Sequence, residues 1–381
     1  MSAPPLTEAL TERVTRWTRP ELHALEPYSL VAPLGDAPVI RYTLDQNEVP
    51  WDVPAPLKQL ALERLAAREW ARYPEMHSDR LRTLLAERHG LSPENVLAGN
   101  GSGELLRLVL AVFGGPGRVV LGHEPSFALY RPLVLESGAR PRFLPPREDL
   151  RLPLEELERE IEADPARPLL LCSPNNPTGE AATPTAIARL LERLDAPLLL
   201  DNAYGEFCSH DYRPLLAHHP NLVLLRTLSK AWSLAGARVG YLLAHAEVVA
   251  ELLKVKLPYN VSQAGAVLGE TALEHPRHAD RCVRLLCARR EQWTTALHGR
   301  GIEVFDSEAN FLLLRTPRAA ELRAALARAG VLVRDVGRYP GLAGCLRVTV
   351  GASPALRAIL GVLDRLGLHP TADSTPAKEE P

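Results

Sequence analysis

Lysine is scarce in this sequence. The 381 residues contain five lysines against 39 arginines, and the lysines are Lys58, Lys230, Lys254, Lys256 and Lys378. Where arginine supplies nearly all of the positive charge, a lysine at a buried-looking position calls for a chemical reason. Lys230 is such a lysine. It lies in the stretch TLSKAWSLAGARVG, residues 227–240, which comes after the apolar run 221–225.

Other absences restrict the class of protein. No apolar run approaches the roughly 20 residues needed to cross a bilayer, and a formal net charge of −2 offers no attraction to nucleic acid or to an anionic membrane. The five cysteines form no C-x-x-C pair, as expected of reduced thiols. The start, MSAPPLTEALTERV, has no basic stretch followed by an apolar one, so we expect no secretory signal. These features predict a cytoplasmic protein that binds neither nucleic acid nor membrane.

Apolar runs alternate with helix-like segments between about residues 95 and 245. The runs are 118–122, 168–172, 197–201, 221–226 and 239–244, and helices are expected at 103–113 and 185–194. Wholly apolar runs of about five residues are typical of strands covered on both faces. The prediction is therefore an α/β fold with a mostly parallel sheet flanked by helices.

The chain length favours one large domain and one smaller domain. We predict the large domain at 46–260 and a smaller α+β domain at 261–368, with a helix at 281–297 and strands at 310–315 and 345–350. Residues 1–45 are expected to form an N-terminal arm and to complete the smaller domain. The polar, proline-rich tail 369–381 is predicted to be disordered.

Polar groups follow the apolar runs, where ligands of open α/β sheets gather. The loop SPNNPTGE comes after 168–172, Asp201 ends the next run, and Ser229 and Lys230 come after the third, with Arg238 eight residues further on. The segment GNGSGE, residues 99–104, opens an apolar helix and offers an anion site. Three neighbouring strand ends thus bring an amide, a carboxylate and an amine to one edge.

Each feature alone has a plain structural explanation. Asp201 could cap a helix, Lys230 and Arg238 could be solvated or paired charges, and GNGSGE could be an ordinary turn. GNGSGE also resembles a dinucleotide-binding fingerprint, but Glu104 stands where the third glycine would be required. If all of these plain explanations were correct, unrelated features would have to lie at the same edge of the sheet by coincidence.

The combination suits pyridoxal 5′-phosphate (PLP). This cofactor needs a lysine amine to form an imine with its aldehyde, which a guanidinium cannot do. It also needs a carboxylate at the pyridine nitrogen, and hydroxyls, backbone N–H groups and an arginine at the phosphate. No H-x-x-H, H-E-x-x-H or cysteine cluster predicts a metal site.

At this level of detail the chain resembles the fold-type I aminotransferases, and within them the histidinol-phosphate aminotransferase family, over about residues 20–365. The resemblance is carried by PYSL (27–30), QNEVP (46–50), RYPE (72–75), NVLAGNGSGELL (95–106), EPSFALY (124–130), CSPNNPTG (172–179), DNAYGEF (201–207), RTLSKAWSLAGARVGY (226–241), VLVRD (331–335) and GCLRVTVG (344–351). The spacing of 13 residues between Arg334 and Arg347 supports a phosphorylated substrate.

The resemblance implies the residues around the cofactor ring. Lys230 binds the cofactor covalently and moves the substrate proton, and Asp201 pairs with the pyridine nitrogen. Tyr204 and Asn176 hydrogen-bond the ring oxygen. Phe127 stacks on the ring where the family more often has tyrosine.

The resemblance also implies the phosphate and substrate contacts. Ser102, Gly103, Ser229 and Arg238 would hold the phosphate, together with Tyr73 of the neighbouring subunit, so the active unit would be a homodimer. The substrate side would be lined by Tyr28, Asn47, Arg334 and Arg347.

The implied reaction exchanges an amino group between L-histidinol phosphate and 2-oxoglutarate, giving L-glutamate, in histidine biosynthesis. An aromatic amino-acid aminotransferase of the same fold is one alternative. A threonine-phosphate decarboxylase is another, and it would share the lysine and the arginines. A binding module or regulator that has lost catalysis is a further alternative, which the intact lysine, aspartate and phosphate set disfavours. The sequence departs from the family pattern at Asn202, which follows Asp201 where the family commonly has glutamate. The resemblance assigns no cofactor contact to this position.

Overall fold

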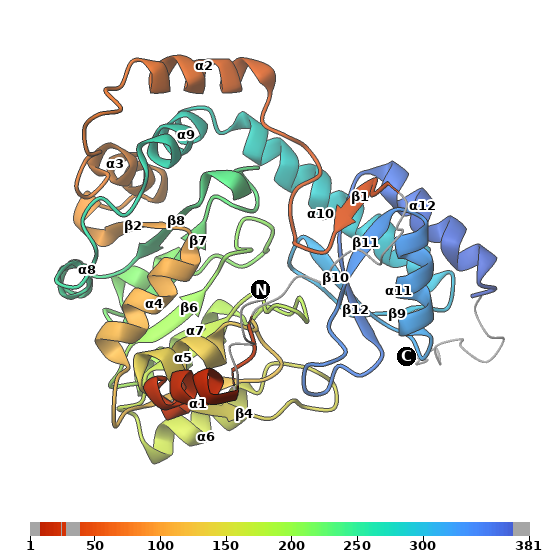
Figure 1. Ribbon diagram of the computed structural model, residues 1–381, viewed down its shortest axis with the longest axis horizontal. Helices are drawn as coiled ribbons and strands as arrows, with labels where there is room; N and C mark the ends of the chain where they lie inside the picture. The colour runs from red at the N-terminus through yellow and green to blue at the C-terminus, as the bar shows by residue number, and fades with distance from the viewer. Residues whose placement is uncertain (1–7, 24, 28–38, 369–381) are drawn as a thin grey trace, which may run out of the picture.

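The computed structural model describes residues 8–23, 25–27 and 39–368. It has a larger body built on a seven-stranded sheet and a smaller body built on a five-stranded sheet, which lie side by side (Figure 1). The α/β architecture and the mostly parallel large sheet were predicted, and both are confirmed. The predicted tail at 369–381 and the substrate-side residue Tyr28 lie outside the described residues.

The large sheet has the strand order β2-β8-β7-β6-β5-β3-β4. Its strands are β2 (Val96–Asn100), β3 (Val119–His123), β4 (Arg140–Leu144), β5 (Leu169–Cys172), β6 (Leu198–Asp201), β7 (Leu222–Thr227) and β8 (Val239–Leu243). The strands from β4 to β7 are parallel, whereas β8 is antiparallel to both β7 and β2. The edge strand β4 was not predicted, because its sequence RPRFL alternates exposed and partly buried residues instead of forming an apolar run.

Helices cover both faces of the large sheet, because its central strands are apolar on both sides. In β5, Leu170 faces a core that includes Leu106 of α4 and Val134 of α5, while Leu169 and Leu171 face the core of the opposite side. The helices of the larger body are α2 (Ala55–Ala66), α3 (Asp79–His89), α4 (Ser102–Phe113), α5 (Tyr130–Ser137), α6 (Leu154–Ala163), α7 (Pro184–Arg193), α8 (Ala246–Leu253) and α9 (Gln263–Glu274). Helix α1 (Glu8–Trp17) lies near α5 and α6 (Figure 1).

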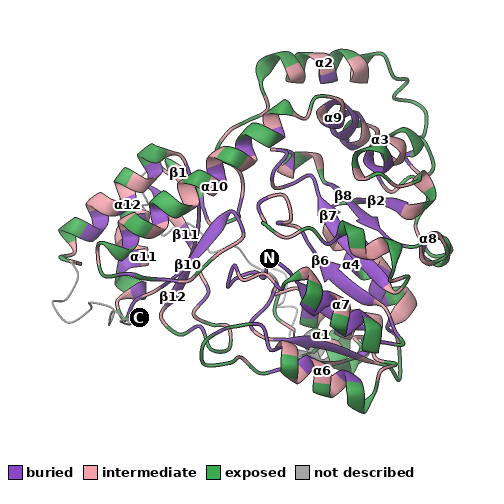
Figure 2. Cartoon of the chain, turned by 180° about the vertical axis from the view of Figure 1, so that it is seen from behind, coloured by how far each residue is buried: buried purple, intermediate pink, exposed green. Residues whose placement is uncertain are grey.

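The smaller body combines segments from both ends of the chain. Its sheet has the order β1-β11-β12-β10-β9, with β1 (Tyr42–Leu44), β9 (Glu303–Val304), β10 (Phe311–Arg315), β11 (Val331–Asp335) and β12 (Cys345–Thr349). Helices α10 (Arg277–His298), α11 (Ala319–Arg328) and α12 (Ser353–Arg365) accompany it. The strands of both sheets are largely buried, as their purple colour in Figure 2 shows.

The position of helix α9 differs from the predicted division of the chain into domains. The boundary after residue 260 assigned this helix to the smaller body, yet it packs against α2 and α3 of the larger one. Glu274 at its end forms ion pairs with Arg64 of α2 (2.6 Å) and with Arg80 of α3 (2.8 Å). No helix in the described part of the chain is both long and apolar enough to span a membrane.

Candidate active site

The carboxyl ends of β5, β6 and β7 open onto a cavity of about 170 Å³. Its lining residues come from these strand ends, from the start of α4 and from the loops between them: Ser102, Phe127, Cys172, Asn176, Asp201, Ala203, Tyr204, Thr227, Ser229, Lys230 and Arg238. The structure thus brings together eight of the predicted cofactor residues. Gly103 follows Ser102 in the first turn of α4. A larger cavity of about 860 Å³, lined in part by Arg290 and Glu308, contains none of the predicted residues.

Lys230 lies just beyond β7, with its amine in the cavity. Its Nζ donates a hydrogen bond of 2.7 Å to the backbone oxygen of Gln46, in the segment that follows β1 of the smaller body. Burial lowers the pKa of Lys230 to about 8, and the nearby guanidinium groups of Arg347 and Arg238 act in the same direction. A useful fraction of the amine is therefore neutral and nucleophilic near physiological pH, which no arginine could achieve.

Asp201 ends β6 and is a buried carboxylate. Its Oδ2 accepts a hydrogen bond of 2.7 Å from the hydroxyl of Tyr130, and its Oδ1 accepts one of 3.1 Å from the N–H of Ala203. Burial raises the pKa of Asp201, while these two donors and the charge of Lys230 oppose that rise by stabilising the ionised form. Tyr130 had no predicted role, although it is the last residue of the quoted motif EPSFALY.

The start of α4 forms an anion site together with Arg238. Gly101 caps the helix without any side-chain hydrogen bond, so the first N–H groups of α4 have no capping side chain. Arg238 donates to the hydroxyl of Ser229 over 3.3 Å, and its Nη2 lies only 2.4 Å from where a Cβ on Gly101 would be. A side chain at position 101 would thus occupy the place of the guanidinium.

The smaller body supplies the other side of the site. Asn47, buried and with a positive φ of 56°, donates from Nδ2 to the hydroxyl of Tyr204 over 2.9 Å. Arg347 donates from Nη1 to Oδ1 of Asn176 over 2.6 Å, and from Nη2 to the backbone oxygen of Asp45 over 2.6 Å. Four predicted side chains from distant parts of the sequence therefore meet at one contact surface.

Arg334 lies directly opposite Arg347 in the antiparallel pair of β11 and β12. Directly opposed residues of such a pair project from the same face of the sheet. Two arginine side chains thus project from the face on which Arg347 contacts Asn176 of the cavity lining.

Tyr73 lies apart from this cavity. Its side chain is 81% exposed and stacks on Tyr259 with a ring-centroid distance of 4.6 Å. Tyr73 lines a different cavity, of about 340 Å³, with Arg68 and Glu270.

Comparison with known proteins decides the family. Residues 41–365 match the family described as aminotransferase class I and II. The chain belongs to the class I and II aminotransferases. Histidinol-phosphate aminotransferase of Roseiflexus castenholzii is 38% identical over 366 residues, covering 92% of this chain and 98% of that protein.

Solved structures share the fold of this aminotransferase chain. Histidinol-phosphate aminotransferase from Sinorhizobium meliloti, in complex with pyridoxal-5′-phosphate, has a TM-score of 0.77 at 24% identity, covering 86% of this chain and 92% of that one. L-threonine-O-3-phosphate decarboxylase from Porphyromonas gingivalis has a TM-score of 0.75 at 25% identity, covering 86% and 99%. The fold is therefore common to enzymes of different activities.

The residues of the cavity fit PLP, the cofactor of this aminotransferase family. An uncapped helix start, Ser229 and Arg238 suit a phosphate, a buried carboxylate suits a pyridinium nitrogen, and an amine of lowered pKa suits an aldehyde. The edge-on pair of Phe127 and Tyr130, with ring centroids 5.6 Å apart, holds the aromatic ring that lines the cavity.

The first prediction concerns Lys230. The rate at which the apo protein captures PLP covalently should rise with pH up to about 8 and then level off, because only the neutral amine attacks the aldehyde. Borohydride treatment followed by peptide mass analysis should find the reduced adduct on the Lys230 peptide. Lys254→Ala, at an exposed position, serves as the control and should leave the adduct unchanged. An adduct on any other lysine would contradict the assignment.

The second prediction concerns Asp201. Asp201→Asn should still bind PLP, but transamination should fall at least ~100-fold, since one preorganised charge contact contributes about 3 kcal/mol to transition-state stabilisation. Single-turnover kinetics of the loaded enzyme would measure the loss. Turnover close to that of the unchanged protein would show that this carboxylate does not stabilise the developing charge.

Proposed function

We propose that this protein is a PLP-dependent histidinol-phosphate aminotransferase of histidine biosynthesis. It exchanges an amino group between L-histidinol phosphate and 2-oxoglutarate, giving L-glutamate. Its similarity to the Roseiflexus castenholzii enzyme over almost the whole of both chains supports this activity. The observation that carries the proposal is the site itself, where a lysine amine and a buried carboxylate line one cavity. Arg347, paired across the strands with Arg334, contacts Asn176 of that lining.

The two arginines explain how one site accepts two unlike amino donors. Histidinol phosphate carries a phosphate and no carboxylate, whereas glutamate carries two carboxylates. Guanidinium groups bind phosphate and carboxylate alike with paired hydrogen bonds. Arg347 is braced by Asn176 and the backbone of Asp45, which suits a fixed anchor. We expect its cross-strand neighbour Arg334 to bind the distal anion.

The other residues bind, orient and move protons. When bound, PLP supplies an electron sink for the substrate carbon. Asp201, held by Tyr130, provides the negative charge opposite the ring nitrogen, and Asn176 and Tyr204 orient the ring oxygen. Nζ of Lys230 takes up and releases the proton of the substrate carbon, for which a pKa of about 8 is well matched.

A threonine-phosphate decarboxylase is the nearest rival, because the Porphyromonas gingivalis enzyme has the same fold. An aromatic amino-acid aminotransferase would use the same lysine and carboxylate, but its amino donor carries no phosphate. Substrate comparison separates these activities.

We expect the wild-type enzyme to transaminate histidinol phosphate far more efficiently than histidinol, phenylalanine or threonine phosphate. Arg334→Leu should raise the KM for histidinol phosphate. The corresponding loss of apparent binding free energy should be about 2–4 kcal/mol, the order expected when a buried charge loses its partner. Its effect on unphosphorylated histidinol should be much smaller. A coupled assay of glutamate formation measures transamination of all four substrates, and CO2 release from threonine phosphate measures decarboxylation.

Arg315→Leu is the matched control, since Arg315 lies on β10 of the same sheet and pairs with Glu303 instead. It should leave both KM values unchanged. If Arg334→Leu weakens histidinol and histidinol phosphate equally, Arg334 has a structural role. If the wild-type enzyme treats the two substrates alike, the histidinol-phosphate assignment fails.

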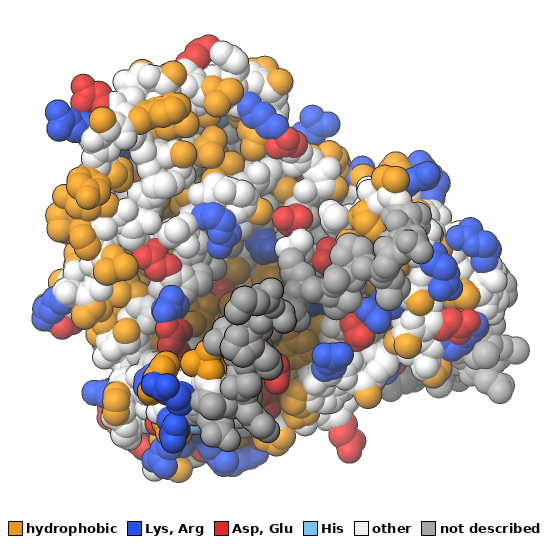
Figure 3. Space-filling model, viewed as in Figure 1, with side chains coloured by type: hydrophobic (Ala, Val, Ile, Leu, Met, Phe, Trp, Pro, Cys, Tyr) orange, Lys and Arg blue, Asp and Glu red, His pale blue; other side chains and the backbone are white. Residues whose placement is uncertain are grey.

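We further propose that the active unit is a cytoplasmic homodimer. Its five cysteines are all free thiols, as suits a reducing compartment. Exposed apolar side chains gather on the side of the molecule formed by α2, α3 and α8 (Figure 3), and they include Trp70, Tyr73 and Leu257. Such a patch is typical of a protein interface, and it would bring Tyr73 to the cofactor phosphate of the partner.

Mixed dimers test this arrangement. Tyr73→Phe should weaken PLP binding about 10-fold through loss of one charge-assisted hydrogen bond, and Lys230→Ala should be inactive. When the two variants are mixed and allowed to exchange subunits, one site of each mixed dimer regains both residues. Activity should therefore recover, and sedimentation should show a dimer. No recovery on mixing would mean that Tyr73 acts within its own chain, or not at all.

A further inference from the structure

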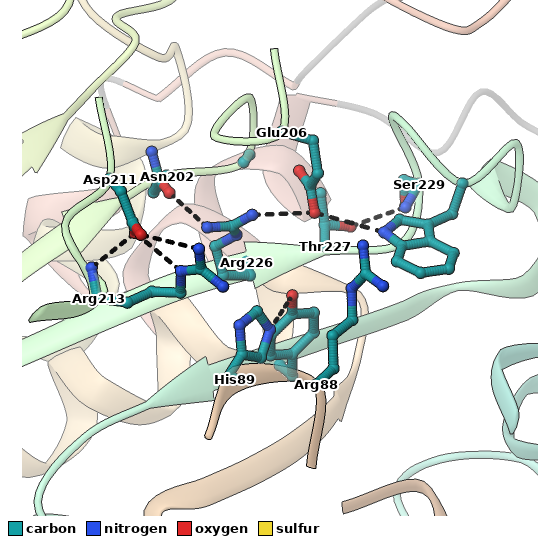
Figure 4. Close-up of polar contacts among 12 residues, drawn as sticks. Arg88, His89, Asn202, Glu206, Asp211, Arg213, Arg226, Thr227 and Ser229 are labelled. Atoms are coloured by element: carbon teal, nitrogen blue, oxygen red, sulfur yellow. Dashed lines mark hydrogen bonds and ion pairs between the residues drawn. The ribbon is translucent and has the colours of Figure 1, made fainter. Parts of the chain in front are cut away.

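A buried polar cluster lies beneath the strand ends of the site (Figure 4). At its centre is Arg226 of β7, whose Nη2 pairs with Oε1 of Glu206 at 3.0 Å. Trp232, two residues after Lys230, donates from its indole N–H to the same Oε1 over 3.4 Å. The cluster therefore connects the segment that follows Asp201 with the segment that carries Lys230.

Asn202 joins this cluster to a third segment. Its Oδ1 accepts a hydrogen bond of 2.9 Å from Nη1 of Arg226, and its Nδ2 donates one of 2.6 Å to the backbone oxygen of Ser173. Its backbone N–H continues the ladder to Leu225 over 2.9 Å. The side chain is 1% exposed and does not line the cavity. Asn202 thus links β6, β7 and the loop that carries Asn176.

Only an amide can make both side-chain contacts. A carboxylate could accept from Arg226 but has no proton to donate to the carbonyl of Ser173. It would therefore leave two buried acceptor oxygens facing each other, its own and the carbonyl oxygen of Ser173. The chemistry of the side chain, and not only its size, therefore matters at this position.

Gly205 provides the space for this amide. A Cβ built on Gly205 would lie 2.0 Å from Oδ1 and 2.7 Å from Nδ2 of Asn202. The backbone N–H of Gly205 also donates to the oxygen of Asn202 over 3.0 Å, which closes the turn. Any side chain at 205 would push the amide away from its two partners.

We propose that Asn202 is a positioning residue that fixes the carboxylate of Asp201 relative to the Asn176 loop and to Lys230. It acts through three hydrogen bonds to segments that each carry a residue of the site. The inference rests on the proposed function only where kcat and KM are measured with histidinol phosphate. Small displacements of reacting groups carry large costs in rate, so the amide affects turnover without touching substrate.

Asn202→Asp tests the role of the amide. It should lower kcat about 10-fold or more, the loss expected from one buried hydrogen bond left unmade, and should weaken PLP binding to the apo protein several-fold. The KM for histidinol phosphate should stay within about 2-fold, because Asn202 lies away from the arginines that bind substrate anions.

Asn221→Asp is the matched control. Asn221 also donates from Nδ2 to backbone carbonyls, to Leu194 over 3.0 Å and to Leu191 over 3.1 Å. It directly precedes β7, however, and so lies at the amino-terminal ends of the parallel strands, away from the site. The two variants should show similar losses in thermal midpoint, while only Asn202→Asp changes kcat and the PLP dissociation constant. Equal kinetic effects, or none in Asn202→Asp, would overturn the proposal.

A double-variant cycle tests the link to Gly205. Gly205→Ala should reduce kcat and PLP affinity about as much as Asn202→Ala does, because its methyl group displaces the amide. Combining the two should cost little more than Asn202→Ala alone. Additive losses would show that Gly205 acts independently of Asn202. PLP affinity is measured without substrate, so it tests the positioning role even if histidinol phosphate proves not to be the substrate.

Discussion

The hydrogen-bond ladder that joins β5, β6 and β7 determines where the groups of the site lie. Cys172 is opposite Asp201, and Asp201 is opposite Leu225, so the three parallel strands end nearly level. A slip of one residue would turn every side chain of a strand to the other face. Asp201 would then leave the cavity for the position that Asn202 holds, and the buried carboxylate would lie beside Arg226. The wholly apolar strands favour this register only through their packing on both faces, and the polar contacts of Asn202 add a specific constraint.

The charges of the site are unbalanced in a way that suits its ligands. Lys230 and Arg238 line the cavity, whereas Asp201 is the one carboxylate among its lining residues. Burial is the main cause of the lowered pKa of the lysine amine, and the charges of Arg347 and Arg238 lower it further, against the opposing charges of Glu48 and Asp201. A cofactor phosphate and an anionic substrate would both be attracted to these positive groups, and each would offset part of the repulsion among them. Beneath the cavity, Arg226 and Glu206 compensate each other separately.

Much of this arrangement could be predicted from the sequence, since its strongest signals are local. Apolar runs located the central strands, and the residues that follow them located Asp201 and Lys230. The edge strand β4 gave no such signal because its arginines face solvent. The position of α9 reflects its packing against α2 and α3, about 200 residues earlier in the chain, which no local pattern reveals. The partners of Asn202 are 24 and 29 residues away, so its departure from the common glutamate was visible but its purpose was not. Tyr130 was quoted within a motif, yet only the fold brings its hydroxyl to Asp201.

The placement of β1 has a consequence for when the site comes into being. The N–H of Asn47 bonds to Thr349, 302 residues later in the chain, and the carbonyl of Asn47 accepts from Asn310. A chain emerging from the ribosome carries Asn47 long before either partner exists, and contacts of such long sequence separation form late. The larger sheet, with Lys230 and Asp201, is complete about a hundred residues earlier than β12. For that interval the nascent chain has the cofactor lysine but not the wall that Asn47 and Arg347 provide, so the last strands synthesised turn an open lysine pocket into an enclosed active site.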